Sequence, residues 1–342
     1  MQRRGPDDEK AALRQPMPTE LLLRPNRMRR YLLQRLVQLI VLLLVGSVVD
    51  WYLIYLTPGS PVYALLGTNA SPSQVRVLKR SLGLDKPLPV QYVTWLNHVL
   101  HGNLGSSFIS GLQTTTLLAQ RVPASLQLVI ASFVLGLLVA LVLGSLAAIR
   151  PRSVVSTLVS AYSSLSLSLP TFWLGIILIL IFSVRLHLFP GSSTYIPIWQ
   201  HPMSGLKAMT LPVASLTFYI GGIMTRFVRA ALTDALQEDY IRTARSIGVP
   251  NYLVIIKHAL RNAMLPIVTV TGLQFGTFVG GTVITESVFQ YPGIGTLILA
   301  SVQQHDYAVL QGTVLLLVAV VAVVNLVVDL TYAYLNPRIR YG

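Results

Sequence analysis

The chain has 342 residues, of which 53% are hydrophobic and 11% charged, whereas soluble domains average about 45–50% apolar and about 25% charged residues. This shortage of charge excludes an ordinary soluble protein. The absence of cysteine excludes disulfides, thiolate metal sites and cysteine nucleophiles, and the net charge of +14 must be judged by where the basic residues lie.

The N-terminal segment 1–28 is polar, contains four prolines and has too few apolar side chains to offset the entropy of ordering. We expect it to be a disordered cytoplasmic tail. A first membrane span is predicted at 29–56, where Asp50 is the one acidic residue in an otherwise apolar run. Its length and the lack of a small-residue cleavage site argue against a cleaved signal peptide.

The segment 57–121 is the largest loop and is predicted to contain short helices outside the cytoplasm. Ser71 and Pro72 have the order of an N-cap and a proline at the first helical position, and Gly83 stands where such a helix would end. A second amphipathic stretch has apolar residues at helical spacing: Val90, Val93, Leu96 and Leu100. This loop either packs over the ends of the membrane helices or docks an external partner, and the two roles are compatible.

Five further spans are predicted from windows without charge, because a transmembrane helix needs about 20 mostly apolar residues. These windows hold 28, 32, 18, 24 and 22 residues and lie at 122–149, 153–184, 208–225, 262–285 and 307–328. The predicted fold is therefore an all-α integral membrane protein with six transmembrane helices. The second to sixth spans form a core domain over 122–342.

The basic residues fix the orientation of these helices. With a cytoplasmic N-terminus, 19 of the 26 Lys and Arg residues lie in inside segments and 7 in outside segments. Cytoplasmic loops carry the excess of Lys and Arg in membrane proteins, so both termini are predicted to be cytoplasmic. The basic character is thus a topology signal, and no nucleic acid partner is expected.

The cytoplasmic segment 233–263 is predicted to form a helix, a break and a second helix. Glu238 and Arg242 are spaced as a favourable i,i+4 pair. Gly248 and Pro250 then end the first helix, and Asn251 is suited to cap the second. Such a segment at the membrane surface would act as a rigid lever.

This segment resembles the permease subunits of ATP-binding cassette importers, whose signature is Glu-Ala-Ala, three residues, Gly, and a later Leu-Pro. Here residues 242–248 (RTARSIG) occupy that frame and Leu265-Pro266 closes it. Arg242 and Thr243 replace Glu and the first Ala, and the spacing to Pro266 is longer, as in the peptide branch of the family.

The resemblance extends from about residue 29 to the end of the chain. Stretches similar to the first permease subunit of dipeptide and oligopeptide importers are RYLLQRLVQLI (30–40), LTPGSPV (56–62), LGLDKPLPVQYVTWL (82–96), GNLGSSF (102–108), LPTFWLG (169–175), ITESVFQYPGIGTL (284–297) and DLTYAYLNPRIRYG (329–342).

The resemblance implies a type I ABC importer permease in the inner or plasma membrane of a prokaryote. It also implies a second permease subunit, two cytoplasmic ATPase subunits and an extracytoplasmic substrate-binding protein. ATP and Mg would bind the ATPases, since this chain lacks the Gly-Lys of a phosphate-binding loop and is not itself an enzyme. The implied ATPase-coupling residues are Asp239, Tyr240, Arg242, Thr243, Ala244, Arg245, Ser246 and Gly248, and the small residues among them would allow close approach to the partner.

Polar residues within membrane spans are functional candidates because of their insertion cost. The candidates for the translocation path or its gates are Asp50, Gln274, Glu286 and Asp329. Glu286 lies at the outer end of the fifth span. The sequence is compatible with two roles for it, as part of an external gate or as a hydrogen-bond partner at the helix end. Structural pairing is favoured for Asp329, and a buried hydrogen bond is favoured over contact with a substrate amine for Asp50.

The motifs leave functions other than peptide import open. Nickel and glutathione importers share these motifs. A stand-alone secondary transporter or channel should show inverted repeats and interrupted helices, and the sequence indicates neither. A Ser–His intramembrane protease is disfavoured because Ser106 and Ser107 lie outside the spans and His258 lies on the other side of the membrane. The histidines show no metal-ligand spacing.

Overall fold

The computed structural model of the chain describes residues 25–56, 62, 66, 70–81 and 83–335. Its helices are α2 (Pro25–Leu56), α4 (Pro72–Ser81), α5 (Leu88–Leu100), α6 (Thr114–Ile149), α7 (Val154–Ser168), α8 (Thr171–Leu178), η2 (Ile179–Arg185), α9 (Pro202–Gln237), α10 (Asp239–Ser246), α11 (Asn251–Leu253), η3 (Val254–Leu260), α12 (Arg261–Val288), α13 (Ile294–Gln304) and α14 (Tyr307–Leu335). Residues 1–24 of the expected tail lie outside the described residues. Residues 25–28 belong to α2, which begins with Pro25 at its first position, where the missing N–H costs nothing.

Among the residues that the structure describes, five helical segments are long and apolar enough to cross a membrane. They are Leu32–Tyr52, Thr114–Ile149, Pro202–Gln237, Asn251–Val288 and Tyr307–Thr331. The sixth expected span is the pair of Val154–Ser168 and Thr171–Arg185, which is bent by 103° between its halves. The prediction of six spans therefore holds when this bent pair is counted as one.

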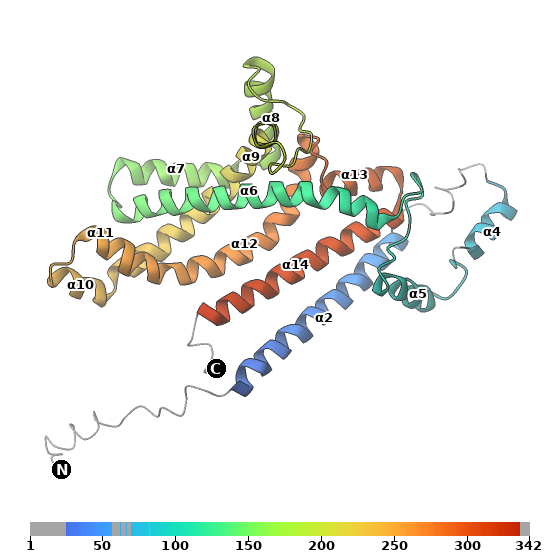
Figure 1. Cartoon of the computed structure of the whole chain (residues 1–342), viewed down its shortest axis with the longest axis horizontal. Helices are drawn as coiled ribbons and strands as arrows, with labels where there is room; N and C mark the ends of the chain where they lie inside the picture. Colours follow the sequence, from blue (N-terminus) through green and yellow to red (C-terminus); the bar gives the residue numbers. More distant parts are fainter. Residues whose placement is uncertain (1–24, 57–61, 63–65, 67–69, 82, 336–342) are drawn as a thin grey trace, which may run out of the picture.

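The bend corrects the expectation that no helix is interrupted. Pro170 has no N–H to continue the hydrogen bonding of α7, and its ring forces the preceding residue out of the helical region. Leu169 accordingly has φ −92° and ψ 122°. The chain leaves α7 there and starts α8 in a new direction, so α8 points away from the line of α7 (Figure 1) while it still contacts α9 and α12.

The helices run between two ends of the molecule. α10 and α11 lie at one end, and α4 and α5 lie at the other (Figure 1). The first turn of α2 and the last turn of α14 point toward the α10 end, where the basic residues also place the cytoplasm. We call the two ends the cytoplasmic and the outer end.

The core lies between α6 and α9, which contact each other along most of their length. Ala124 and Ala140 of α6 are fully buried, and they belong to the same core cluster as the large side chains of Leu216 and Met224 of α9. Small residues on one helix let the backbones approach closely, which is how membrane helices associate without a hydrophobic driving force. The α6–α9 pair is thus the rigid centre on which the other helices pack.

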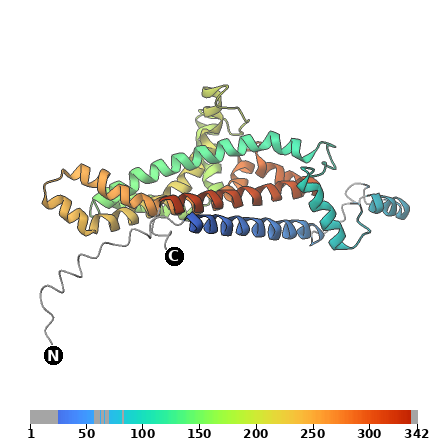
Figure 2. The ribbon, with the colours of Figure 1, turned by 60° about the horizontal axis from the view of Figure 1, so that its bottom comes forward.

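α2 lies at the edge of the molecule and packs along α14 (Figure 2). Most of its apolar side chains are exposed, with Leu33 62% and Val37 58% accessible. At the cytoplasmic end the Arg35 guanidinium pairs with the Asp329 carboxylate at 3.1 Å. This ion pair fixes α2 to α14 on one face and leaves the opposite face of α2 to lipid or another subunit.

The outer segment contains the two predicted short helices. Ser71 caps α4 by a reciprocal pair of bonds, since Gln74 N donates to Ser71 Oγ at 3.3 Å and Ser71 N donates to Gln74 Oε1 at 3.0 Å. Gly83 ends this turn with φ +67°. The apolar face expected on α5 is largely exposed, and α5 instead contacts α2 through Tyr92, whose ring lies edge-on to Trp51 with centroids 5.7 Å apart.

Asp306 anchors the outer segment to the start of α14. Its buried carboxylate accepts hydrogen bonds from Ser107 Oγ at 2.5 Å and from Phe108 N at 3.2 Å. We expect Asp306→Ala to free residues 102–113, because each buried donor that loses its acceptor costs about 1–3 kcal/mol. Amide hydrogen exchange of this segment in the detergent-solubilised protein should rise at least tenfold. Asp85→Ala, at an exposed acid of the same segment, should leave exchange unchanged, and equal exchange in both variants would refute the anchor.

Candidate functional site

The cytoplasmic tip is a helix, a break and a second helix, as predicted. α9 ends at Gln237, Glu238 is extended at φ −67° and ψ 149°, and α10 follows at once. Gly248 then has φ +81°, a left-handed conformation that glycine adopts without strain. Pro250 leads into α11, which continues through η3 into α12.

Two details of this tip differ from the predictions. Arg242 pairs with Asp239 at 3.4 Å rather than with Glu238. Because Glu238 precedes the helix and is not helical, the two residues do not share an i,i+4 face of α10. Asn251 is the first residue of α11 and makes no capping bond, since the helix start falls on Pro250.

Of the predicted coupling residues, Ala244 lies on the buried face of α10 beside Ile241, which the prediction did not include, and the other seven are exposed. Ile241 and Ala244 are buried and pack toward η3 and α9. Ala244 therefore does not belong to an exposed small-residue surface, contrary to the prediction. The exposed members of the predicted set are Asp239, Tyr240, Arg242, Thr243, Arg245, Ser246 and Gly248.

Three apolar residues at the tip were missed by the sequence interpretation. Ile247, Tyr252 and Ile256 are 74%, 64% and 62% exposed. Ile247 lies between α10 and α11, and Tyr252 and Ile256 lie at the cytoplasmic start of the segment Asn251–Val288, before its uncharged window at 262–285. Clustered apolar side chains on a water-facing surface mark a protein contact site. We call Tyr240, Ile247, Tyr252 and Ile256 together with the exposed α10 residues the tip surface.

The outer end contains a second polar arrangement around Glu286, near the end of α12. The Glu286 carboxylate is 1% exposed. Its Oε1 accepts from Ser125 Oγ of α6 at 2.5 Å, and its Oε2 accepts from Gly295 N at 2.7 Å. Ser125 Oγ also accepts from Ile294 N at 2.7 Å. Glu286 and Ser125 therefore satisfy the first N–H groups of α13 and join α6, α12 and α13.

The turn between α12 and α13 is shaped around this carboxylate. Tyr291 N donates to the Glu286 carbonyl at 2.8 Å, and Gln290 has φ 49°. At Gly295 a Cβ atom would lie 2.5 Å from Val283 Cα, so that position tolerates only glycine. The Gly-Ile-Gly sequence thus brings the start of α13 against α12, with the carboxylate enclosed between them.

The other candidate path residues lie elsewhere. Asp50 in α2 is 4% exposed, and its Oδ2 has no hydrogen-bond partner among the described residues, so the expected buried hydrogen bond is not seen for that oxygen. Gln274 is half-buried in the middle of α12. Asp329 pairs with Arg35 at the cytoplasmic end. The structure therefore separates these residues rather than gathering them into one site.

No group of three or more His, Asp or Glu residues is placed to hold a metal ion in the part of the chain that the structure describes.

Two family descriptions match the sequence. Residues 140–341 match the binding-protein-dependent transport system inner membrane component. Residues 28–129 match the N-terminal membrane component of binding-protein-dependent transport systems. The two matches together cover both the outer segment and the six-span region.

Relatives and a solved structure agree with these descriptions. A Brucella abortus protein named as a peptide transport system permease is 35% identical over 314 residues, covering 92% of this chain and 100% of the relative. The glutathione transport system permease protein GsiC of Salmonella paratyphi A is 39% identical over 316 residues, covering 92% of this chain and 100% of the relative.

The fold is similar to that in a structure of inward-facing conformations of the MetNI methionine ABC transporter, with a TM-score of 0.52 at 19% identity. The similarity covers 64% of this chain and 96% of that one. The family matches, the relatives and the helical architecture agree, and the chain is a multi-pass inner membrane protein that belongs to the family of binding-protein-dependent transport system inner membrane components.

Proposed function

We propose that this chain is one of two permease subunits of an ATP-driven importer and forms half of a translocation pathway for dipeptides and oligopeptides by alternating access. The observation that carries the proposal is the tip surface, an exposed polar and apolar surface at the cytoplasmic end of a family member. The names of the 35% identical relatives support peptides as the substrate class.

The tip surface is the proposed docking site for a cytoplasmic ATPase. Its exposed arginines, Arg242 and Arg245, can pair with carboxylates of the partner, while Ile247 and Tyr252 supply apolar contact area. ATP and Mg bind the ATPases and supply the energy of hydrolysis. This chain contributes the contact that receives the movement.

The path from the tip to the outer end is built from continuous helices. α9 extends 36 residues from the outer end to α10, and α11, η3 and α12 together return over Asn251–Val288. A rigid-body displacement of α10 must move both helices, because α10 packs on α9 and η3. Glu286 stands at the far end of α12, so an ATPase movement can reach the outer end through one helix.

The outer segment is the proposed contact for a substrate-binding protein. Val90, Val93 and Leu100 of α5 are 45%, 63% and 76% exposed, and this face has no cover within the described chain. A second permease subunit and lipid are proposed to cover the exposed faces of the membrane helices.

Glutathione is the second candidate substrate, supported by the 39% identical relatives named for its transport. Nickel importers share the family motifs, but the names of the Brucella and Salmonella relatives refer to peptide and glutathione transport. A stand-alone secondary transporter is not favoured, because the family to which the chain belongs works with a separate binding protein.

Purification of the tagged chain in mild detergent tests the proposed assembly. We expect a second permease and ATP-hydrolysing subunits to co-purify, identified by mass spectrometry and by ATPase activity. Ile247→Asp with Tyr252→Asp should release the ATPases and retain the second permease, because charge at the tip surface opposes apolar docking. Val93→Asp on α5 is the matched control and should retain both. A chain that purifies alone and transports without ATP would contradict the proposal.

A further inference from the structure

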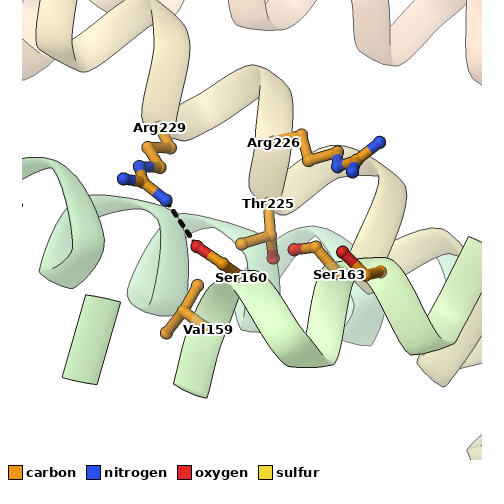
Figure 3. Close-up of a pocket in the computed structure, with 7 residues that line it drawn as sticks. Val159, Ser160, Ser163, Thr225, Arg226 and Arg229 are labelled. Carbon is orange, nitrogen blue, oxygen red and sulfur yellow. Dashed lines mark hydrogen bonds between the residues drawn. The ribbon is translucent and has the colours of Figure 1, made fainter. Parts of the chain in front are cut away.

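A polar cavity of about 180 Å³ lies between α7 and α9. It is lined by Val159, Ser160, Ser163 and Ser164 of α7 and by Thr225, Arg226 and Arg229 of α9. In Figure 3 the Arg229 guanidinium points toward Ser160, while the exposed Arg226 side chain extends from α9 on the other side of Thr225, away from Ser160. Pockets that enclose a whole drug-sized ligand measure about 300–1,000 Å³. This cavity therefore suits one end group of a larger molecule.

The cavity offers positive charge without a negative partner. Arg229 Nη1 donates to Ser160 Oγ at 2.7 Å, which holds that guanidinium in place. Arg226 makes no hydrogen bond or ion pair with any described residue, and no acidic side chain lines the cavity. Two arginines and several serines that line one cavity favour an oxyanion, since arginine binds carboxylates and phosphates through paired N–H donors.

The cavity lies in the cytoplasmic half of the membrane region. Arg226 and Arg229 are the first charges on α9 after 18 uncharged residues, 11 and 8 residues before the helix ends at Gln237. On α7 the cavity residues lie between the cytoplasmic start at Val154 and the break at Pro170. An anion in the cavity would therefore have passed most of the apolar thickness.

The break at Pro170 indicates what covers this face. Non-helical backbone at membrane depth is tolerated only where protein covers it or where it lines a water-filled cavity. Pro170 is exposed, as are Phe172 and Trp173 at 42% and 46%, so the described part of the chain does not cover the break. The face must meet a second subunit or water.

A row of hydroxyls on α7 runs from the break past the cavity toward the cytoplasmic start of the helix. Thr157, Ser164 and Ser168 are exposed on α7 at spacings of seven and four residues, which puts them on one face. Ser164 also lines the cavity. Polar residues of a membrane helix face the bundle interior or water. The row and the cavity together make a polar route on the cytoplasmic side of the break.

We propose that this cavity binds the C-terminal carboxylate of a peptide on its way to the cytoplasm, with Arg226 and Arg229 as its charge partners. The inference rests on the proposed function. Every peptide ends in a carboxylate whatever its side chains, so a site for that group serves substrates of varied sequence. The phosphate of an inner-leaflet lipid has the same oxyanion chemistry, and the experiment separates the two sources.

A protection experiment tests the site directly, because the natural chain has no cysteine. Ser163→Cys puts one thiol in the cavity of the reconstituted complex. We expect millimolar alanyl-alanine to slow its reaction with an anionic thiosulfonate, whereas alanyl-alanine amide should not. Arg226→Gln with Arg229→Gln should abolish this protection. Protection by the amide as well, or by neither compound, would overturn the proposal.

Two further measurements complete the test: thiol labelling in vesicles of different lipid composition, and ATP-driven uptake of dipeptide. Slower labelling in vesicles of phosphatidylglycerol than of phosphatidylcholine, with no effect of the dipeptide, would assign the cavity to lipid and overturn the proposal. The double arginine variant should reduce ATP-driven dipeptide uptake about tenfold or more, roughly the effect of losing one charge-assisted bond. Arg150→Gln, outside the cavity, is the matched control and should transport normally.

The outcomes of the two proposals are distinguishable. If the unmodified complex takes up no dipeptide with ATP, the proposed function fails. If the unmodified complex transports and the double arginine variant transports equally well, only the carboxylate site fails. Arg226→Lys keeps the charge and should retain more uptake than Arg226→Gln, which separates a charge effect from a folding defect.

Discussion

Glu286→Ala is expected to loosen the outer end of the protein and to abolish transport. The substitution removes the acceptor of the Ser125 hydroxyl and of the Gly295 N–H, both of which stay buried. Each unpaired buried donor costs about 1–3 kcal/mol, so the first turn of α13 should detach from α12.

A single thiol on α13 measures this loosening. Ser301 is 3% exposed, and Ser301→Cys should react slowly with a membrane-impermeant maleimide added from outside. Adding Glu286→Ala should raise the labelling rate at least tenfold, while Glu238→Ala, at an exposed acid near the cytoplasmic tip, should not. Unchanged labelling with Glu286→Ala would show that the carboxylate does not hold α13.

The assembled state separates a gate from a packing role for Glu286. Loss of transport in an intact complex would support a gate at the outer end, whereas loss of the complex would support packing alone. Ser125→Ala should be non-additive with Glu286→Ala in the thermal midpoint, because the two residues share one network.

Gly248→Val is expected to abolish coupled transport while the complex stays assembled. At φ +81° a β-branched residue is strained by about 1–2 kcal/mol. That cost is small for the fold but similar to a coupling free energy of about 1–3 kcal/mol between sites. Stimulation of the ATPase by loaded binding protein should therefore be lost, as measured in reconstituted vesicles at equal permease content.

Two controls separate backbone strain from a steric effect at this position. A Cβ at Gly248 meets no atom within 4 Å among the residues that the structure describes, so these residues leave room for a side chain there. Gly248→Asn tolerates the left-handed conformation and should retain coupling if backbone shape is what matters. Gly102→Val imposes the same strain at φ +78° on the outer side and should transport normally. Normal stimulation and uptake in Gly248→Val would exclude this loop as the coupling element.

The membrane spans could be predicted because bilayer thickness and the cost of burying charge set their length and position. The break in the third span could not. Pro123, Pro212 and Pro266 lie inside the unbroken helices α6, α9 and α12, whereas Pro170 separates α7 from α8. A proline in an apolar run indicates a weak point, and the packing of neighbouring helices decides whether the helix continues.

The candidate sites were predicted less completely. The signature around Gly248 located the tip. Packing against η3 and α9 decides which side of α10 is exposed, and the sequence does not specify this packing. For that reason the prediction put Ala244 on the exposed face and missed Ile247. The cavity was not predicted. From the sequence, Arg226 and Arg229 served only as evidence for the orientation in the membrane, and the serines of α7 were interpreted as small residues that allow close helix packing. Their juxtaposition depends on how α7 lies across α9, which no local pattern specifies.

Uptake by the complete complex tests the central claim most directly. The permease pair, its ATPases and a loaded substrate-binding protein should be reconstituted in sealed vesicles, with radiolabelled dipeptide or glutathione supplied on the side of the binding protein. We predict accumulation above the external concentration only when hydrolysable ATP and the binding protein are both present, with dipeptide taken up faster than glutathione. Accumulation driven by a proton or sodium gradient, by this chain without ATPase subunits, would contradict the account.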